Sequence, residues 1–339
     1  MVSVGDNVEV TEYNDYVARV NIILGIGSGK KGYGVAMAGT GQAVAGTTDI
    51  TAVQWAGLRT DINLIYSHQL NSTTTIGEII AGNIIGADES NVGTGDTVLR
   101  DNATDTFTIV NPDVNKGVND FGPTIPAIEV DPETVHPPHL SVESKITPAT
   151  SGASYTASWN GTLTAEVLVT FAGAYICKAN DGTNVAATND DHRRHFFNTG
   201  GEIRFSSAMV NGTGTKSADW ITMLTNAGTI TIDNSSTTTT GTATVSSTFG
   251  NEDLTTTYQQ VARKYGSDVL YAENNWLVEA KLDGSGNIIF KFSWIDADTG
   301  DPGLDELVDG DVNLTMSQVR CTGPITILDP VYTFQQNIQ

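Results

Sequence analysis

The sequence has few basic residues, few cysteines and no long apolar run. Lysine and arginine number 17 against 39 aspartates and glutamates, which gives a formal charge of −22. This shortage of positive charge argues against nucleic acid as a partner, because phosphate binding depends on Lys and Arg contacts, and it argues equally against an anionic membrane surface. No apolar stretch approaches the roughly 18 residues of a membrane-spanning helix, so none is expected.

Cysteine occurs only at Cys177 and Cys321. Two cysteines in a chain of 339 residues do not form a disulfide framework, and two reduced thiols are the favoured state. A bridge between them depends on geometry that the sequence does not show. The N-terminus lacks a basic region followed by an apolar run, so no secretory signal is expected.

What the sequence does contain near its N-terminus is helical periodicity. Apolar residues recur at spacings of three and four from Tyr13 to Leu24, and again from Trp55 through Leu58 to Ile65. Each series forms one apolar stripe along a helix. The pattern predicts a small helical hairpin within residues 1–70.

The segment LGIGSGKKGYG between these helices contains the pattern G-x-G-x-x-G at Gly27, Gly29 and Gly32. A dinucleotide site needs a strand before such a loop and a helix directly after it. Here a helix precedes the glycines, and none is expected to follow before Thr51. We therefore interpret the segment as a helix end followed by a loop that needs positive φ angles, and we predict no phosphate or other cofactor.

The remaining chain divides into a linker and a β region. Residues 71–140 are rich in Gly, Asn, Asp and Thr and then in proline, which predicts an extended linker or arm. In residues 141–339, apolar and polar residues alternate in short runs separated by Gly, Asn and Asp turns, as in antiparallel sheets. The chain is therefore predicted to be mainly β, with a C-terminal antiparallel β-sandwich or jelly-roll-like domain.

Three shorter features refine this prediction. Residues 283–287 form a Gly-containing hairpin turn between two strand-like runs. The run SADWITMLTNAG predicts one inserted helix with Ser217 as its N-cap. Residues 255–266 are compatible with either a strand or a helix.

The segment NDDHRRHFFN carries residue types that bind metals: Asp190, Asp191, His192 and His195. Its H-x-x-H spacing places both imidazoles on one face only if the segment is helical, and no third ligand is indicated. The alternative is a polar turn leading into the next strand, anchored by Phe196 and Phe197. This alternative is favoured, so no metal site is predicted.

The acidic run Asp296–Asp311 departs from the EF-hand pattern, because Asp301 and Leu307 stand where Gly and Glu are required. A loose calcium site and a solvated loop both stay open. The sequence also lacks a G-x-S-x-G elbow, and no carboxylate pair stands out for glycoside hydrolysis. No catalytic residues are predicted, and the chain is interpreted as not being an enzyme.

Several longer motifs occur in a fixed order: EYNDYVARVNIILGIGSGKKGYG, ITAVQWAGLRTDI, DDHRRHFFNTGGEIRFSS, DWITMLTNAGTITI, FSWIDADTGDPG and VDGDVNLTMSQVRCTGPITI. Together they resemble virion structural proteins of tailed marine phages, notably contractile-tailed cyanophages. The resemblance implies a non-enzymatic part of the neck, tail, baseplate or fibre attachment. Such parts assemble in the bacterial cytoplasm, with other virion proteins, as trimers or hexameric rings.

If the chain acts by assembly, its large apolar side chains near the N-terminus are candidate interface anchors. The candidate interface residues are Tyr16, Tyr33, Trp55 and Leu58. The alternative for each is burial in the core of its own domain.

A second functional hypothesis is a carbohydrate- or receptor-binding β-sandwich module on the particle surface, with a host surface glycan as partner. β-Sandwiches commonly host such sites, although the fold does not imply the function. This hypothesis predicts exposed aromatic side chains, with Trp276 and Tyr271 as candidates.

Overall fold

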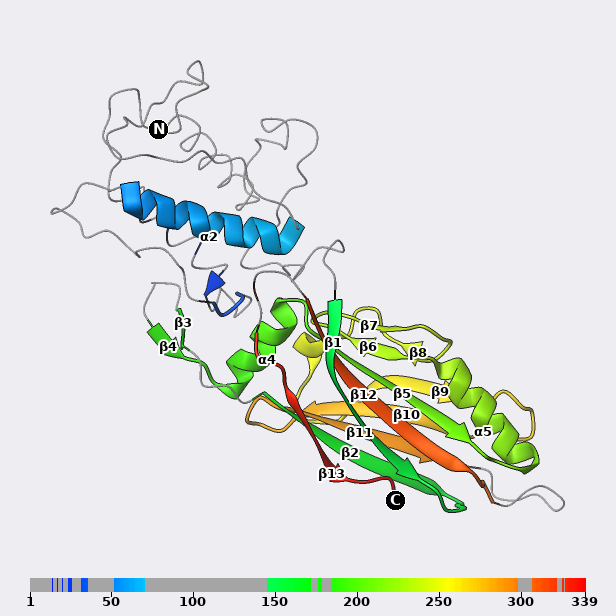
Figure 1. Cartoon of the computed structure of the whole chain (residues 1–339). Helices are drawn as coiled ribbons and strands as arrows, with labels where there is room; N and C mark the ends of the chain where they lie inside the picture. Colours follow the sequence, from blue (N-terminus) through cyan, green and yellow to red (C-terminus); the bar gives the residue numbers. More distant parts are fainter. Residues whose placement is uncertain are drawn as a thin grey trace, which may run out of the picture. The chain divides into compact units, whose positions relative to one another are not determined.

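The computed structural model describes residues 14, 17, 20, 24, 25, 32–35, 52–70, 145–171, 176–178, 184–297, 307–321, 325 and 327–339. The chain divides into two compact units (Figure 1). Unit 1 consists of Met1–Ser144, Ala174–Ala187 and Cys321–Ile327, and unit 2 of Lys145–Gly173, Thr188–Arg320 and Leu328–Gln339. The predicted division into 1–70, 71–140 and 141–339 stays a prediction.

Unit 1 contains the predicted helical periodicity. Helix α2 (Ala52–Leu70) buries Leu58, Ile62 and Ile65, the stripe expected from the sequence. The described positions of the first helix are helical as well, and its apolar residues Val17, Val20 and Leu24 are buried. A separate pair of short strands, β3 (Ile176–Lys178) and β4 (Asn184–Ala186), completes the regular structure described in this unit.

The glycine loop ends the first helix, as predicted. Leu24 is its last helical residue among those described. The backbone of residues 34 and 35 is hydrogen-bonded to the helix end: Gly34 N donates to the carbonyl of Gly25 at 2.8 Å, and Val35 N donates to that of Leu24 at 2.6 Å. Gly34 adopts a positive φ of 74°, which glycine tolerates without a steric cost. Both lysines of the segment lie outside the described residues.

Unit 2 is a sandwich of two antiparallel sheets, which confirms the predicted fold class. The first sheet has the strand order β1 (Lys145–Tyr155), β12 (Asp311–Cys321), β5 (Glu202–Val210), β6 (Ile230–Ile232) and β7 (Thr237–Thr239). The second has the order β13 (Val331–Gln336), β2 (Thr162–Thr170), β11 (Ile288–Ile295), β10 (Asn275–Leu282), β9 (Gln259–Tyr265) and β8 (Thr244–Val245). The early strands β1 and β2 thus lie beside the late strands β12 and β11.

Aromatic side chains fill the space between the two sheets. Phe205 on β5 meets Phe290 and Phe292 on β11 at ring distances of 5.5 and 5.4 Å. Beside them, the indole Nε1 of Trp294 donates to Ser207 Oγ at 2.9 Å, so this buried N–H group has a hydrogen-bond acceptor. Burial alternates strictly with period 2 along β2, so that every second side chain of this strand faces the core.

Two α-helices accompany the sandwich: α4 (Asn189–Asn198) and α5 (Gly214–Ala227), the latter packed on β5 and β9 (Figure 1). The prediction that Ser217 caps α5 is wrong, because the helix begins at Gly214 with Thr213 as N-cap. The carboxylate of Asp309 explains the earlier start: it accepts from Thr213 N at 2.8 Å and from Ser217 Oγ at 2.7 Å. No helix in the described part of the chain is long and apolar enough to cross a membrane.

Strand pairing in the second sheet decides two remaining predictions, the turn at 283–287 and the segment 255–266. The β10–β11 hairpin is confirmed, with Asp283 N donating to the carbonyl of Asn287 at 3.0 Å. Within the ambiguous segment 255–266, residues Gln259–Tyr265 form strand β9. Pairing with β10 decided this outcome.

Candidate interaction site

Helix α4 replaces the polar turn that the sequence favoured at NDDHRRHFFN, so that prediction is wrong. Thr188 and Asp191 form a capping box: Thr188 Oγ1 accepts from Asp191 N at 3.1 Å, and Asp191 Oδ2 accepts from Thr188 N at 2.9 Å. The acidic side chains in the first turn also favour the positive end of the helix dipole. Phe196 and Phe197 are buried, as the turn interpretation had also required.

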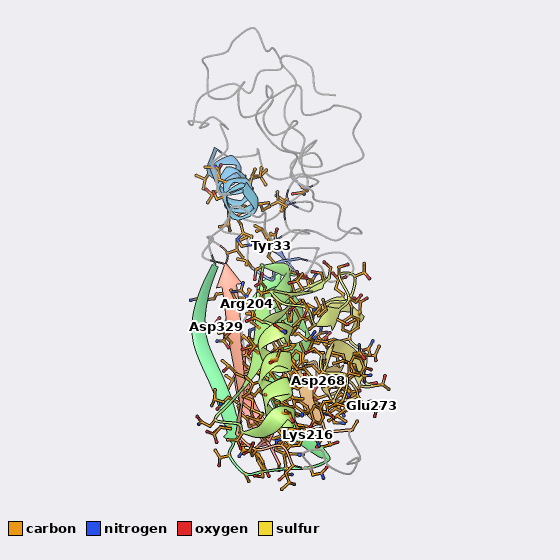
Figure 2. All side chains as sticks on the ribbon, turned by 90° about the vertical axis from the view of Figure 1, so that its right-hand side faces the viewer. Tyr33, Arg204, Lys216, Asp268, Glu273 and Asp329 are labelled. Atoms are coloured by element: carbon orange, nitrogen blue, oxygen red, sulfur yellow. The ribbon has the colours of Figure 1, made fainter. Side chains whose placement is uncertain are left out.

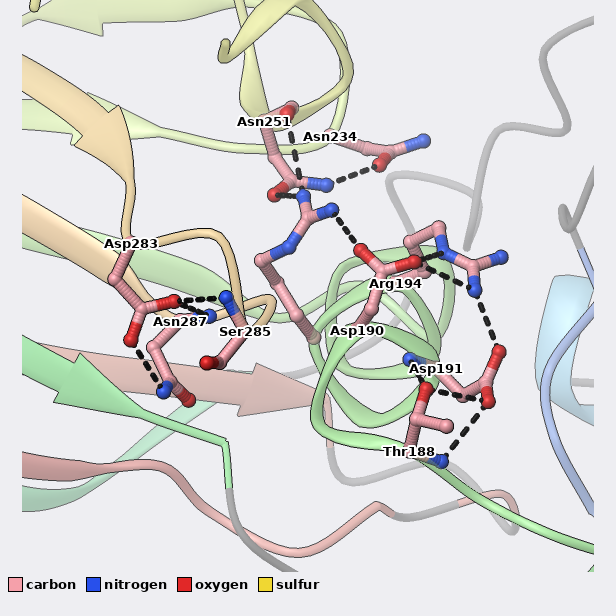
Figure 3. A network of polar contacts seen from close by, with 10 residues as sticks. Thr188, Asp190, Asp191, Arg194, Asn234, Asn251, Asp283, Ser285 and Asn287 are labelled. Carbon is pink, nitrogen blue, oxygen red and sulfur yellow. Dashed lines mark hydrogen bonds and ion pairs between the residues drawn. The ribbon is translucent and has the colours of Figure 1, made fainter. Parts of the chain in front are cut away.

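The charged side chains of α4 neutralise one another (Figure 3). Arg193 Nη2 lies 2.6 Å from Asp190 Oδ1, and its Nη1 donates to Asn251 Oδ1 in the 3₁₀ helix η3 (Asn251–Asp253). Arg194 Nη2 lies 2.5 Å from Asp191 Oδ1 and 3.1 Å from Asp190 Oδ2. Burial alone would raise the pKa of Asp191, but hydrogen bonds from Thr188 and the charge of Arg194 lower it.

The two histidines of α4 are core residues. His192 and His195 are both fully buried. His192 Nε2 lies 2.7 Å from the carbonyl oxygen of Leu328, so this nitrogen carries the proton. Burial lowers the pKa of His192 and lowers that of His195 to about 3, and both rings are neutral at neutral pH. In the part of the chain that the structure describes, no three His, Cys, Asp or Glu side chains converge on a metal position.

The acidic run is described only at its two ends. Asp296 is buried and lies 2.8 Å from Lys216 Nζ, while Asp309 accepts a hydrogen bond from the backbone of Thr213, the N-cap residue of α5. Hydrogen bonds from Thr213 and Ser217 lower the pKa of Asp309 to about 2. Residues 298–306, which contain most of the proposed calcium ligands, lie outside the described part, so the calcium hypothesis stays a prediction.

Of the four candidate interface residues, the structure describes the side chains of two. Tyr33 and Leu58 are buried within the chain, and the ring of Tyr33 meets that of His68 edge-on at 5.0 Å. Trp55 lies on α2 but its side chain is outside the described set, as are Tyr16 and the thiols of Cys177 and Cys321. The assignment of these residues to an interface stays a prediction.

The exposed aromatics expected for glycan binding are not found at the two candidate positions. Trp276 and Tyr271 are buried, with exposed fractions of 0% and 1%. The ring of Trp276 contacts Phe205 of the opposite sheet at 6.5 Å. That prediction is wrong because the inward period of β10 includes Trp276.

The loop between β9 and β10, residues 266–274, is fixed from beneath by α5. Asp219 Oδ1 accepts from Ser267 N and Oγ, both at 3.2 Å, and from Asp268 N at 3.0 Å. Tyr271 is buried, and its hydroxyl lies 3.2 Å from Thr215 Oγ1. A side chain therefore holds each half of the loop to the same helix.

Between these two anchors the loop exposes an apolar tip, consisting of Val269 and Leu270. Their exposed fractions are 92% and 56%, the former the largest among the exposed apolar residues described. The acidic residues Asp268 and Glu273 lie in the same loop (Figure 2). Because the backbone is already fixed, a partner that covers the tip orders little further chain. The loop thus has the features of a preformed protein contact.

The apolar tip escaped the sequence prediction, because a Val-Leu pair inside a polar turn carries no periodicity. The buried Lys216 was also missed, although a signal existed. It precedes Trp220, Leu224 and Ala227 on one face of α5, so its position belongs to the apolar stripe.

Comparisons with known proteins do not supply an identity. Neither a protein-family model, nor a curated protein, nor a solved structure matches this chain.

Proposed function

We propose that this chain is a non-enzymatic structural component of a tailed-phage virion, in the neck, tail, baseplate or fibre attachment. It acts by symmetric assembly with copies of itself and with other virion proteins. The observation that carries the proposal is the apolar tip, Val269 and Leu270, which the chain exposes on a braced loop. Large apolar groups in fixed positions are the usual centres of protein interfaces.

The motifs that resemble phage structural proteins support the proposal from another direction. In HFFNTGGEIRF, Phe196, Phe197, Ile203 and Phe205 are all core residues. A Cβ on Gly201 would collide with Phe196, so glycine is required there. The motif therefore describes the packing of a sandwich scaffold, which suits a protein whose task is to hold shape.

The test is the mass of the purified full-length chain in solution, measured by light scattering after size-exclusion chromatography. We expect a defined trimer or larger ring. Val269→Asp/Leu270→Asp should dissociate it without lowering the midpoint of thermal unfolding, because neither side chain belongs to the core. Val331→Asp is a matched control, since Val331 is 63% exposed and lies on β13, which β2 and β11 separate from β10 in the second sheet.

A wild-type chain that is monomeric at all concentrations would contradict self-assembly through the tip, as would an oligomer that the double variant leaves intact. Immunogold labelling of whole particles then tests the location. Labelling at one structural level of the virion supports the proposal, and particles without label contradict it.

A further inference from the structure

Lys216 and Asp296 form a charged pair with no exposed surface. Lys216 lies in the first turn of α5, and Asp296 directly follows β11. The distance from Nζ to Oδ2 is 2.8 Å, and both side chains have an exposed fraction of 0% (Figure 2 labels Lys216). The pair joins two elements that are distant in the sequence.

The backbone on both sides of Asp296 is fixed. Asp296 N donates to the carbonyl of Gly161 at 2.7 Å, and Ala297 N donates to Oδ1 of Asn274, itself a buried side chain, at 2.8 Å. The helical backbone of α5 fixes the other partner. The backbones that carry the amine nitrogen and the carboxyl group are thus both fixed, and both side chains are fully buried.

Lys216 lies on the apolar face of α5. One turn further along the same face of α5, Trp220 is fully buried and meets Trp159 at a ring distance of 4.9 Å. Removing two charges from water costs several kcal/mol per ion, and only part of this is recovered by their attraction. An amide formed between the two groups would carry neither charge.

We propose that Lys216 and Asp296 are joined by an intramolecular isopeptide bond. One Nζ proton passes to the Asp296 carboxylate, the Nζ lone pair attacks Cγ, a C–N bond forms, and the bond from Cγ to one carboxyl oxygen breaks. That oxygen leaves as water, with its own proton and one proton from Nζ, so the step needs no oxidant or reductant. Groups held in this way reach effective molarities of about 10⁵–10⁸ M, which is the advantage of the fixed pair over free side chains.

The bond would close a covalent loop from α5 to the end of β11. Such a closure stabilises the folded chain chiefly by restricting the unfolded one. It suits a protein that bears load, but it does not depend on the proposed function and is tested separately.

The experiment is intact mass spectrometry of the denatured full-length chain, followed by proteolysis. We expect a mass lower than that of the sequence by one water molecule, and a branched peptide that contains both Lys216 and Asp296. Lys216→Arg and Asp296→Ala should each restore the mass expected from their sequence. Lys291→Arg is the matched control: its pair with Glu279 is 3.7 Å apart and partly exposed, so the water loss should persist.

Two results would overturn the proposal. One is a wild-type mass equal to that of the sequence after prolonged incubation of the folded protein. The other is a water loss that maps to a succinimide at an Asp-Gly step, such as Asp283–Gly284, without a branched peptide. The wild-type measurement alone decides between these outcomes, so the result does not depend on whether the variants fold.

Discussion

Helices α4 and α5 bury charge in opposite ways. On α4, Arg193 and Arg194 share the carboxylates of Asp190 and Asp191, and Asp190 keeps 37% of its side chain exposed. On α5, Lys216 meets Asp296 in a site without any exposed surface. The first arrangement spreads charge over several hydrogen bonds near water, and the second concentrates it in the dry interior.

This difference separates two uses of ionic groups. A network at the rim of a core satisfies its lone pairs and adds stability at modest desolvation cost. A fully buried pair is weak support for stability, because a well-packed apolar pair would do as well or better. Its presence therefore calls for another explanation, which the proposed isopeptide bond supplies.

The largest expected effect is on the buried pair of α5. Lys216→Ala should lower the free energy of unfolding by about 3–5 kcal/mol, because it removes the proposed cross-link and leaves the Asp296 carboxyl buried without its partner. Urea denaturation followed by tryptophan fluorescence measures the change. As a control, Lys291→Ala should cost about 0–1 kcal/mol, since Lys291 is 34% exposed. Equal losses in the two variants would show that burial does not distinguish these pairs.

The second prediction concerns the close approach of the β10–β11 turn to α4. Gly286 has a φ of 95°, and a Cβ there would overlap the backbone of Asp190. Gly286→Ala should cost about 3–4 kcal/mol from strain and overlap together. Gly284, in the same turn, has a φ of 83° but nothing near its Cβ position, so Gly284→Ala should cost only about 1–2 kcal/mol. Urea denaturation measures both variants, and equal losses in Gly286→Ala and Gly284→Ala would contradict the contact with α4.

The third prediction is a loss of stability in mild acid that comes from α4. The pKa of His195 is about 3 in the folded chain against 6.5 when unfolded, so the unfolded chain binds more protons between these values. The free energy of unfolding should therefore be greatest above pH 6.5 and fall by about 1.4 kcal/mol per pH unit below it. His192, whose pKa is also lowered, acts in the same direction.

His195→Gln should flatten this slope, whatever it does to stability at neutral pH. The difference in slope between wild type and variant from about pH 4.5 to 6.5 isolates His195, because other groups, such as Asp329 with its pKa raised by burial, titrate in both proteins. An unchanged slope in the variant would mean that His195 is not the group responsible.

The smallest expected effect is at the N-cap of α4. Thr188→Ala removes the hydroxyl of the capping box and should cost about 1 kcal/mol. Thr222→Ala on α5 is its control: Thr222 is exposed in mid-helix, and alanine is the better helix former there. Differential scanning calorimetry compares the two, and a larger loss at Thr222 would contradict the capping role.

Much of the fold could be predicted from the sequence, because local periodicity reports directly on it. The stripe of α2, the alternation along β2 and β11, and the turn at 283–287 all appear in the structure where the pattern put them. The errors at NDDHRRHFFN and at Ser217 have different causes. The start of α4 is set by a local capping box, Thr188 with Asp191, which the sequence analysis overlooked, whereas the start of α5 involves Asp309, a partner distant in the sequence.

The candidate site could not be predicted from the sequence, because it depends on contacts between residues that are distant in the sequence. The apolar tip is significant only because Asp219 of α5 holds the loop that presents it. Lys216 and Asp296 are ordinary charged residues until the fold brings them together.

The sequence by itself determined the fold class, since strand alternation and glycine turns are local consequences of side-chain chemistry. Only the tertiary structure decided which charges are buried, which apolar residues are left outside, and which distant groups touch. These depend on the register between strands and on helix packing, where a shift of one residue reverses the face that each side chain occupies.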